Sequence, residues 1–266
     1  FPSHMPVFCD VHTHAFHPKI VDKVLLQLRE HYGITPQGTG CIDDLLKREQ
    51  AAGIDRCVVL CAATAPAQVI PANNWIMSLG KAYPNVIPFG TLHPGYEAWE
   101  SELERLHAAG VRGLKFHPEF QDFWMDDPRL LPILEAAQDR FVILFHVGDR
   151  LPPEKNPSCP YKMAALARAF PKARMVAAHM GGYLHWEAAL KALIGTTVYL
   201  DTSSTLPFIR DDLLHALWQG HPRERICFGS DYPLFDPGQE LDLLGTRLKL
   251  DDNTLEELLN NGEQLF

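Results

Sequence analysis

The chain has 266 residues, of which 46% are hydrophobic and 21% are charged, a composition typical of an ordinary globular protein. Its 24 basic and 33 acidic residues give a net charge of −9, which argues against nucleic acid and anionic membranes as partners, because both attract basic surfaces. No apolar run approaches the ~20 residues of a transmembrane helix, and the N-terminus lacks the apolar core of a signal peptide.

The six cysteines include no CxxC pair, and Cys9, Cys57 and Cys227 lie inside apolar runs where a thiol acts as a small hydrophobic group. We therefore expect reduced thiols and a cytoplasmic location. Residues 1–5 (FPSHM) look like a cloning remnant or a disordered N-terminus, so we expect the folded domain to occupy residues 6–266.

The first expected strand, residues 7–14, ends in the pattern His12-Thr13-His14. Alternate residues of a strand point to the same face, so the two imidazoles should project together from the C-terminal end of a rigid element. Such a pair suits a borderline-soft divalent metal. With 13 histidines in the chain, the pattern can also arise by chance.

Beyond this strand, apolar runs typical of buried strands alternate with segments of helical apolar spacing. The strands are expected at 56–62, 86–93, 111–117, 141–146, 174–179, 197–202 and 225–231, and the helices at 41–53, 75–82, 97–109, 130–138, 161–170, 183–193, 211–219, 240–248 and 253–259. Eight β/α units in this length predict a single-domain (β/α)8 barrel. An open doubly wound sheet would need a glycine-rich loop after the first strand, where this chain has His-Thr-His instead.

Polar side chains follow nearly every expected strand. In a (β/α)8 barrel the C-terminal strand ends converge on one mouth, where the active site lies. Residues scattered through the sequence should therefore meet there. Those at the strand ends are His12, His14, Cys61–Thr64, His93, Lys115, His117, His146, His179, Asp201–Ser204 and Asp231.

Together these segments resemble the amidohydrolase superfamily, and most of all its amidohydrolase-2 branch of metal-dependent hydrolases and decarboxylases. The resemblance covers essentially the whole chain. It rests on the D-x-H-x-H pattern at 10–14 and on GLKFHP (113–118), LFHVGD (144–149), AHMGG (178–182) and GSDYP (229–233), with a closing NGEQLF at 261–266. It implies a TIM barrel in which His12, His14, His146 and Asp231 bind one catalytic metal, while His179 activates the metal-bound water or binds a second metal.

Lys115 leaves two interpretations open. In binuclear members of the superfamily a lysine that ends the fourth strand is carboxylated and bridges two metals, and the stretch at 113–117 resembles that strand. Without this modification, Lys115 would be a bare ammonium that anchors a substrate carboxylate. We therefore expect one or two divalent ions, with zinc as the expected metal.

The leading functional hypothesis is hydrolysis of a C–N or C–O bond of a small amide, lactam, lactone or ester. A divalent metal lowers the pKa of bound water, Asp231 can accept and pass on its proton, and His117 or His179 can stabilise the developing oxyanion. The alternative is a metal-dependent non-oxidative decarboxylase of a small aromatic or unsaturated acid. A third hypothesis, a metal-binding protein without catalysis, conflicts with the complete set of ligand-type residues.

Three further residues have weaker assignments. His93 and Arg150 are candidates for substrate binding, although His93 can equally serve packing and Arg150 can pair with Asp149. Asp10 is either a residue that orients a metal ligand or a structural buried carboxylate. The partner is expected to be a small-molecule substrate. A homo-oligomer is compatible with the sequence, which does not specify an oligomeric state.

Overall fold

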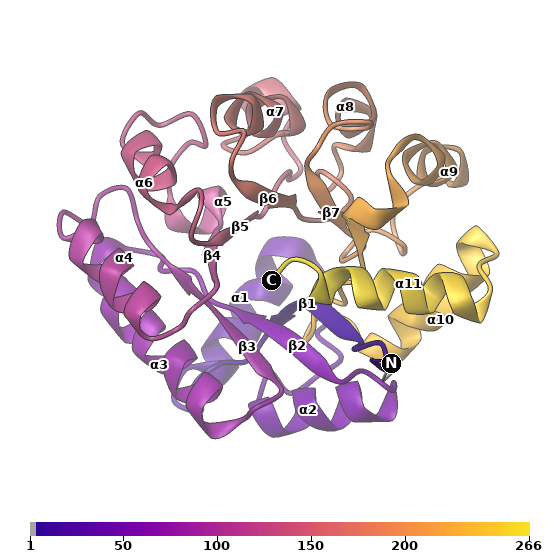
Figure 1. Ribbon diagram of the computed structural model, residues 1–266, viewed down its shortest axis with the longest axis horizontal. Helices are drawn as coiled ribbons and strands as arrows, with labels where there is room; N and C mark the ends of the chain where they lie inside the picture. The colour runs from indigo at the N-terminus through magenta and orange to yellow at the C-terminus, as the bar shows by residue number, and fades with distance from the viewer. Residues whose placement is uncertain (1–3) are drawn as a thin grey trace.

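A computed structural model describes residues 4–266, so residues 1–3 of the leading segment 1–5 lie outside the described part of the chain. Eight parallel strands form one sheet in the order β1 to β8, surrounded by helices (Figure 1), which confirms the predicted single-domain (β/α)8 barrel. The strands are β1 (Cys9–His14), β2 (Arg56–Leu60), β3 (Val86–Thr91), β4 (Gly113–Phe116), β5 (Val142–Phe145), β6 (Arg174–Ala177), β7 (Tyr199–Asp201) and β8 (Ile226–Cys227).

The helices follow the strands in regular alternation, with three short 3-10 turns at Pro66–Gln68, Pro153–Lys155 and Arg223–Arg225. They are α1 (Val21–Tyr32), α2 (Ile42–Ala51), α3 (Val69–Ala82), α4 (Trp99–Ala108), α5 (Pro118–Gln121), α6 (Leu130–Ala137), α7 (Pro160–Ala169), α8 (Trp186–Ala192), α9 (Asp211–Gly220), α10 (Pro237–Leu248) and α11 (Asp252–Glu263). None of the described helices has the length and apolar character needed to span a membrane.

Backbone hydrogen bonds join β1 to the segment that follows β8. The N–H of Val11 donates to the carbonyl of Phe228 at 3.0 Å, and the N–H of Asp231 donates to the carbonyl of His12 at 2.8 Å. One step further, the N–H of His14 donates to the carbonyl of Tyr232 at 2.9 Å. This seam closes the barrel beside the His-Thr-His pattern.

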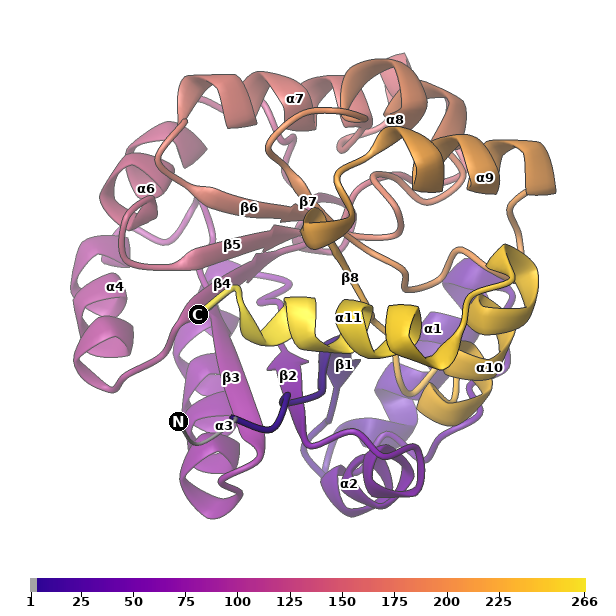
Figure 2. The same cartoon turned by 45° about the vertical axis from the view of Figure 1, so that its right-hand side comes forward.

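The barrel interior is filled by small and branched apolar side chains from alternate strand positions, as expected for this fold. At its N-terminal end, the ring of Phe266 packs edge-on against Phe89 with ring centroids 5.9 Å apart. Figures 1 and 2 show α11 crossing this end of the barrel, while α1 lies behind the strands at the opposite end. The C-terminal mouth is therefore the end that α1 covers.

All the expected strands after the first end one to four residues earlier than the sequence indicates, and two of these differences involve site residues. We expected the sixth strand to reach His179 and the eighth to reach Asp231, but β6 ends at Ala177 and β8 at Cys227. His179 and Asp231 instead have left-handed backbone, with φ of 63° and 62°. Both residues still lie at the mouth, on turns that leave the sheet.

Asp10 lies where strand alternation breaks down. The pairing of β1 with β2 shifts register between Asp10 and Thr13. One carboxylate oxygen of Asp10 accepts from the N–H groups of His12 (3.1 Å) and Ser230 (3.0 Å), so it ties β1 to the segment after β8. Burial raises the pKa of Glu49 on α2, and the charge of the nearby Asp10 raises it further. The carboxylate of Asp10 therefore lies towards the helical layer. This favours the structural interpretation of Asp10.

Glu240 on α10 is a buried carboxylate whose Oε2 has no hydrogen-bond partner among the described residues. Burial, followed by the charges of Asp231 and Asp10, raises its pKa from 4.5 to about 8. Because the folded state binds this proton more tightly than the unfolded chain, the contribution of Glu240 to stability is complete below about pH 4.5 and is lost as the pH rises through 8.

Replacing this carboxylate by an amide should remove that loss. We expect the free energy of unfolding of Glu240→Gln, relative to that of wild type, to rise by about 2 kcal/mol as the pH increases from about 6 to 8. The measurement is urea denaturation of the metal-free protein. The control is Glu256→Gln, at an exposed position of α11, which should show no such gain. An equal response of the two variants would show that Glu240 does not carry the buried proton.

Candidate metal centre

Three ligand-type side chains meet where the barrel closes. Oδ1 of Asp231 lies 3.4 Å from Nε2 of His12 and 3.2 Å from Nε2 of His14. Around a divalent ion with bonds of about 2.1 Å, neighbouring ligand atoms stand roughly 3.0–3.4 Å apart. His12, His14 and Asp231 therefore have the spacing of a site for one divalent ion, and we call them the metal cluster.

The charge state of the metal cluster also suits a cation. Burial lowers the pKa of His14, so its imidazole is neutral and its lone pair is available. Burial alone would raise the pKa of Asp231, but the neighbouring His12 and His14 hold it well below its usual range. The cluster therefore presents the neutral imidazole of His14 and the carboxylate of Asp231 at neutral pH.

Asp201, at the end of β7, fixes the orientation of His12. Its Oδ2 lies 3.0 Å from Nδ1 of His12, which places that ring nitrogen as the donor and turns Nε2 towards Asp231. Its Oδ1 accepts from the N–H of His179 (3.2 Å), the N–H of Ser203 (3.0 Å) and the hydroxyl of Ser203. Because its oxygens already accept these hydrogen bonds, Asp201 would influence a bound metal indirectly, by orienting His12.

A serine on the loop after β7 fixes the orientation of Asp231. The hydroxyl of Ser204 donates to Oδ2 of Asp231, which leaves Oδ1 for the imidazoles. Ser204 and Asp231 both have positive φ, of 44° and 62°. Left-handed backbone at non-glycine residues costs free energy and persists where the surroundings enforce it, often at functional sites.

His146 and His179 form a second pair beside the metal cluster. Nδ1 of His146 lies 3.0 Å from Nε2 of His179, and the rings of His179 and His12 have centroids 5.1 Å apart. The other ring nitrogen of each histidine is also held. Nε2 of His146 lies 2.7 Å from the carbonyl of Gly148, and Nδ1 of His179 lies 2.9 Å from the hydroxyl of Ser203. Burial, and then the charge of His12, lowers the pKa of His179 to about 4, so its ring is neutral.

Glu119 is a buried carboxylate that the sequence analysis did not identify. Its Oε1 accepts from Asn156 (2.7 Å) and from the N–H and hydroxyl of Ser158, while its Oε2 lies 3.7 Å from Nδ1 of His117 and 3.7 Å from Nε2 of His146. Burial raises its pKa to about 7.

His117, Glu119 and His146 do not have the geometry of a metal site, although their ligand atoms are close together. The rings of His117 and His146 stack at a centroid distance of 3.8 Å and an interplanar angle of 10°. Lone pairs of imidazole nitrogens lie in the ring plane, so two nearly parallel stacked rings cannot both direct them at one ion. The metal cluster at the seam is the better site.

Lys115 lies on β4 with its side chain buried in the barrel. Burial lowers its pKa from 10.5 to about 8, against the opposing charges of Asp231 and Asp201. Most of the amine is therefore a cation at neutral pH, and a fraction is the free base that carboxylation requires. The residue has the chemistry for either role that the sequence left open.

The two residues suggested for substrate binding have other contacts. Both ring nitrogens of His93 are engaged, with the carbonyl of Gln121 at 2.8 Å and the N–H of Gly95 at 2.9 Å. The exposed Arg150 donates to the carbonyl of His31, at the end of α1. Neither residue presents its polar group to the metal cluster in this conformation.

Two residues near the mouth come from α1, a helix that the sequence analysis passed over. The imidazole of His31 lies 2.8 Å from Oδ2 of Asp149, and the hydroxyl of Tyr32 lies 3.2 Å from Nε2 of His117. The apolar spacing of residues 21–32 and the following Gly33, with φ of 68°, are the signals that predict this helix. They would not have predicted that it covers the mouth.

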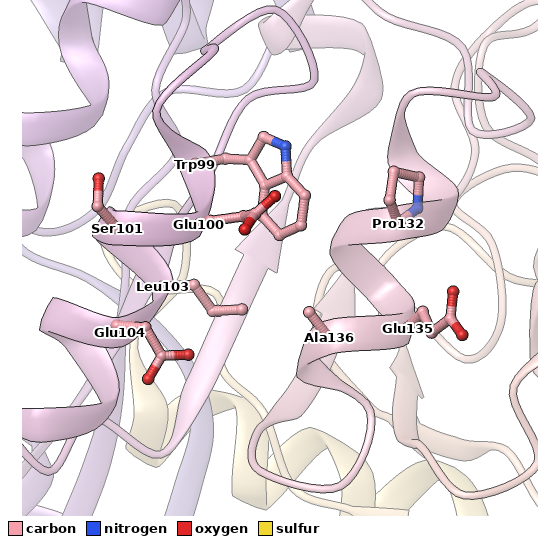
Figure 3. A pocket seen from close by; sticks show the side chains of 8 residues that line it. All are labelled: Trp99, Glu100, Ser101, Leu103, Glu104, Pro132, Glu135 and Ala136. Atoms are coloured by element: carbon pink, nitrogen blue, oxygen red, sulfur yellow. The ribbon is translucent and has the colours of Figure 1, made fainter.

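A groove of about 610 Å³ on the outer helical layer is separate from this centre. It lies between α4 and α6, with Trp99, Glu100 and Glu104 on the α4 side and Pro132 and Glu135 on the α6 side (Figure 3). None of the residues that line it is one of those predicted at the strand ends, so we assign the chemistry to the barrel mouth.

Comparison with known proteins supports the fold and the family. The Amidohydro_2 family model, described as amidohydrolase, matches residues 9–261. No curated protein sequence matches the chain.

Several solved structures share the fold along the whole chain. A 5-carboxyvanillate decarboxylase from Sphingomonas paucimobilis has a TM-score of 0.70 at 15% identity, covering 98% of this chain and 99% of that one. A 2,6-dihydroxybenzoate decarboxylase from Rhizobium has a TM-score of 0.68 at 15% identity, covering 98% of both chains. A 5-carboxyvanillate decarboxylase from Novosphingobium aromaticivorans, complexed with manganese and a nitrobenzoic acid, has a TM-score of 0.69 at 14% identity, covering 98% and 96%.

The orientation of His12 by Asp201 can be tested through metal affinity. We expect Asp201→Asn to weaken binding of Mn²⁺ or Zn²⁺ by about 10- to 100-fold, because the amide no longer holds the Nδ1–H tautomer of His12. The measurement is a competition titration against a chromophoric chelator, with circular dichroism to confirm folding. Asp212→Asn, at an exposed site on α9, is the matched control. Unchanged affinity in a folded Asp201→Asn variant would refute this role.

Proposed function

The chain belongs to the amidohydrolase family, and from this premise we propose that it is a metal-dependent decarboxylase, which releases CO2 from a small aromatic or unsaturated carboxylic acid. The observation that carries the proposal is a cluster for one divalent ion in the same mouth as a buried, cationic lysine, Lys115. One bound ion and the separate ammonium of Lys115 suit a substrate acid that offers oxygen groups to both. The decarboxylases of similar fold, one of them described with manganese, support the same chemistry.

In this proposal His12, His14 and Asp231 hold the ion, and the resemblance adds His146 as a fourth ligand. The three residues of the metal cluster fit, because Oδ1 of Asp231 lies at coordination spacing from both imidazoles, whereas Nδ1 of His146 contacts Nε2 of His179. When bound, a divalent cation binds the oxygen donors of the substrate and withdraws electron density from it. The metal identity is left open between zinc, our expectation from the sequence, and manganese, found in the similar structure.

The protein residues then provide binding and proton transfer. Lys115 pairs with the substrate carboxylate in a buried site, where a charge pair is stronger than in water. As the carbon–carbon bond breaks, its electron pair stays on the unsaturated carbon and CO2 departs, so that carbon must gain one proton. Asp231, whose Oδ2 is held by Ser204, takes this proton from water and transfers it to carbon, and the hydroxide that is left returns to solvent.

Hydrolysis was the leading hypothesis from the sequence, and it now has the weaker support. Its binuclear version needs a carboxylated Lys115 between two ions. Of the two other groups of ligand-type residues, the one around Glu119 has stacked imidazoles, and the one formed by His12, His179 and Asp201 shares His12 with the metal cluster. A pKa of about 8 keeps carboxylation of Lys115 chemically accessible. Hydrolysis by one ion therefore remains the second candidate function.

Metal removal and a substitution at Asp231 test the proposal. With 2,6-dihydroxybenzoate and 5-carboxyvanillate among a panel of aromatic acids, the manganese-loaded protein should release CO2, and chelation should abolish this until manganese is restored. Asp231→Asn should lower turnover at least about 100-fold, because the amide cannot relay a proton. The measurement is CO2 release by a coupled assay.

Asp212→Asn should retain wild-type turnover and serves as the matched control. The opposite pattern, in which the loaded protein hydrolyses lactones or amides and releases no CO2 from any acid of the panel, would refute the decarboxylase and favour the second candidate. The mass of the peptide that contains Lys115 would then show whether that lysine is carboxylated.

A further inference from the structure

The end of α1 places a tyrosine over the barrel mouth. The hydroxyl of Tyr32 lies 3.2 Å from Nε2 of His117, the residue that follows β4. In Figure 1, α1 lies behind the centre of the barrel, at the end opposite α11. Tyr32 therefore lies at the end of the barrel from which a substrate would reach the metal cluster, whose His12 and Asp231 are buried (Figure 1).

The ring of Tyr32 belongs to an aromatic wall made by residues from three different segments. Its centroid lies 5.7 Å from that of Tyr183, at an interplanar angle of 89°, and 5.8 Å from that of Phe120. It also lies 6.5 Å from the ring of His146, beside the metal cluster. Such rings favour offset or edge-on contact with a further planar ring.

The hydroxyl of Tyr32 is suited to donate a hydrogen bond. Burial, and then the charge of Asp149, raises the pKa of Tyr32 well above its ordinary value, so the phenol stays protonated. Nδ1 of the neutral His117 accepts from the N–H of Phe120, so Nε2 carries the ring proton and donates to the oxygen of Tyr32. The phenol hydrogen is therefore free to be donated to an anionic oxygen, an acceptor that forms a stronger hydrogen bond than a neutral one.

The same end of α1 is attached to the loop after β5. His31 pairs with Asp149 at 2.8 Å, and Arg150 donates to the carbonyl of His31. These contacts hold Tyr32 at the mouth, and they give Arg150 a role in positioning α1. The placement of Tyr32 is thus built by two loops as well as by its own helix.

We propose that Tyr32 is a substrate-contacting residue that determines specificity. Its hydroxyl donates to the substrate carboxylate, and its ring, with Phe120 and Tyr183, forms the wall against which a planar unsaturated acid packs. This inference rests on the proposed function for the class of substrate, but it concerns binding, so it can be tested without turnover.

The test compares the affinity of the manganese-loaded protein for benzoate, which is planar, and cyclohexanecarboxylate, which is not, by isothermal titration calorimetry. Wild type should bind benzoate more tightly. Tyr32→Phe should weaken both acids about tenfold and keep the preference, because it removes only the hydroxyl. Tyr32→Leu should in addition reduce the preference for benzoate by roughly three- to tenfold.

Tyr161→Phe, at an exposed position on α7, is the matched control and should bind both acids as wild type does. Manganese affinity, measured in the same variants, should be unchanged, which separates loss of a substrate contact from damage to the metal cluster. Wild-type affinity for both acids in Tyr32→Phe and Tyr32→Leu would overturn the inference. So would a wild-type protein that binds neither acid.

Normal benzoate binding that depends on Tyr32, in a protein that releases no CO2 from any acid, would support this inference while the proposed function fails. The two proposals can therefore fail separately.

Discussion

The backbone hydrogen bonds that close the barrel between β1 and the segment after β8 hold the metal cluster together. Asp231 donates its N–H to the carbonyl of His12, and on either side of this bond Val11 pairs with Phe228 and His14 with Tyr232. The two imidazoles and the carboxylate come from opposite ends of the chain, so their approach to 3.2–3.4 Å depends on this seam. A chain that failed to close the barrel would not assemble the cluster.

Around the seam, neutral partners and one carboxylate fix the direction of each ring. Asp201 orients His12, Ser203 and Gly148 hold the outer nitrogens of His179 and His146, and Ser204 holds the outer oxygen of Asp231. Burial keeps the imidazoles of His14 and His179 neutral, the form in which a ring nitrogen binds a cation. Left-handed backbone at His179, Ser204 and Asp231 is consistent with a site whose geometry is enforced by its surroundings.

Much of the fold follows from the sequence because strand and helix periodicity is a local property. Eight apolar runs predicted the eight strands, and the expected meeting of His12, His14 and Asp231 at one mouth is what the structure shows. The alternation of strand residues did not predict which face Asp10 occupies, because a periodic sequence pattern does not reveal the register shift that follows Asp10. The contacts of Arg150 and Tyr32 depend on where α1 docks, which no local pattern specifies. Ring orientation was likewise unpredictable, since it depends on tertiary partners such as Asp201.

The proposed chemistry depends on a single divalent ion that binds between His12, His14 and Asp231. Native mass spectrometry of the purified chain with added manganese measures this directly, in wild type and in His14→Gln. We predict one ion per chain in wild type and none under the same conditions in the variant. Two ions per wild-type chain, or one ion retained in folded His14→Gln, would contradict the account.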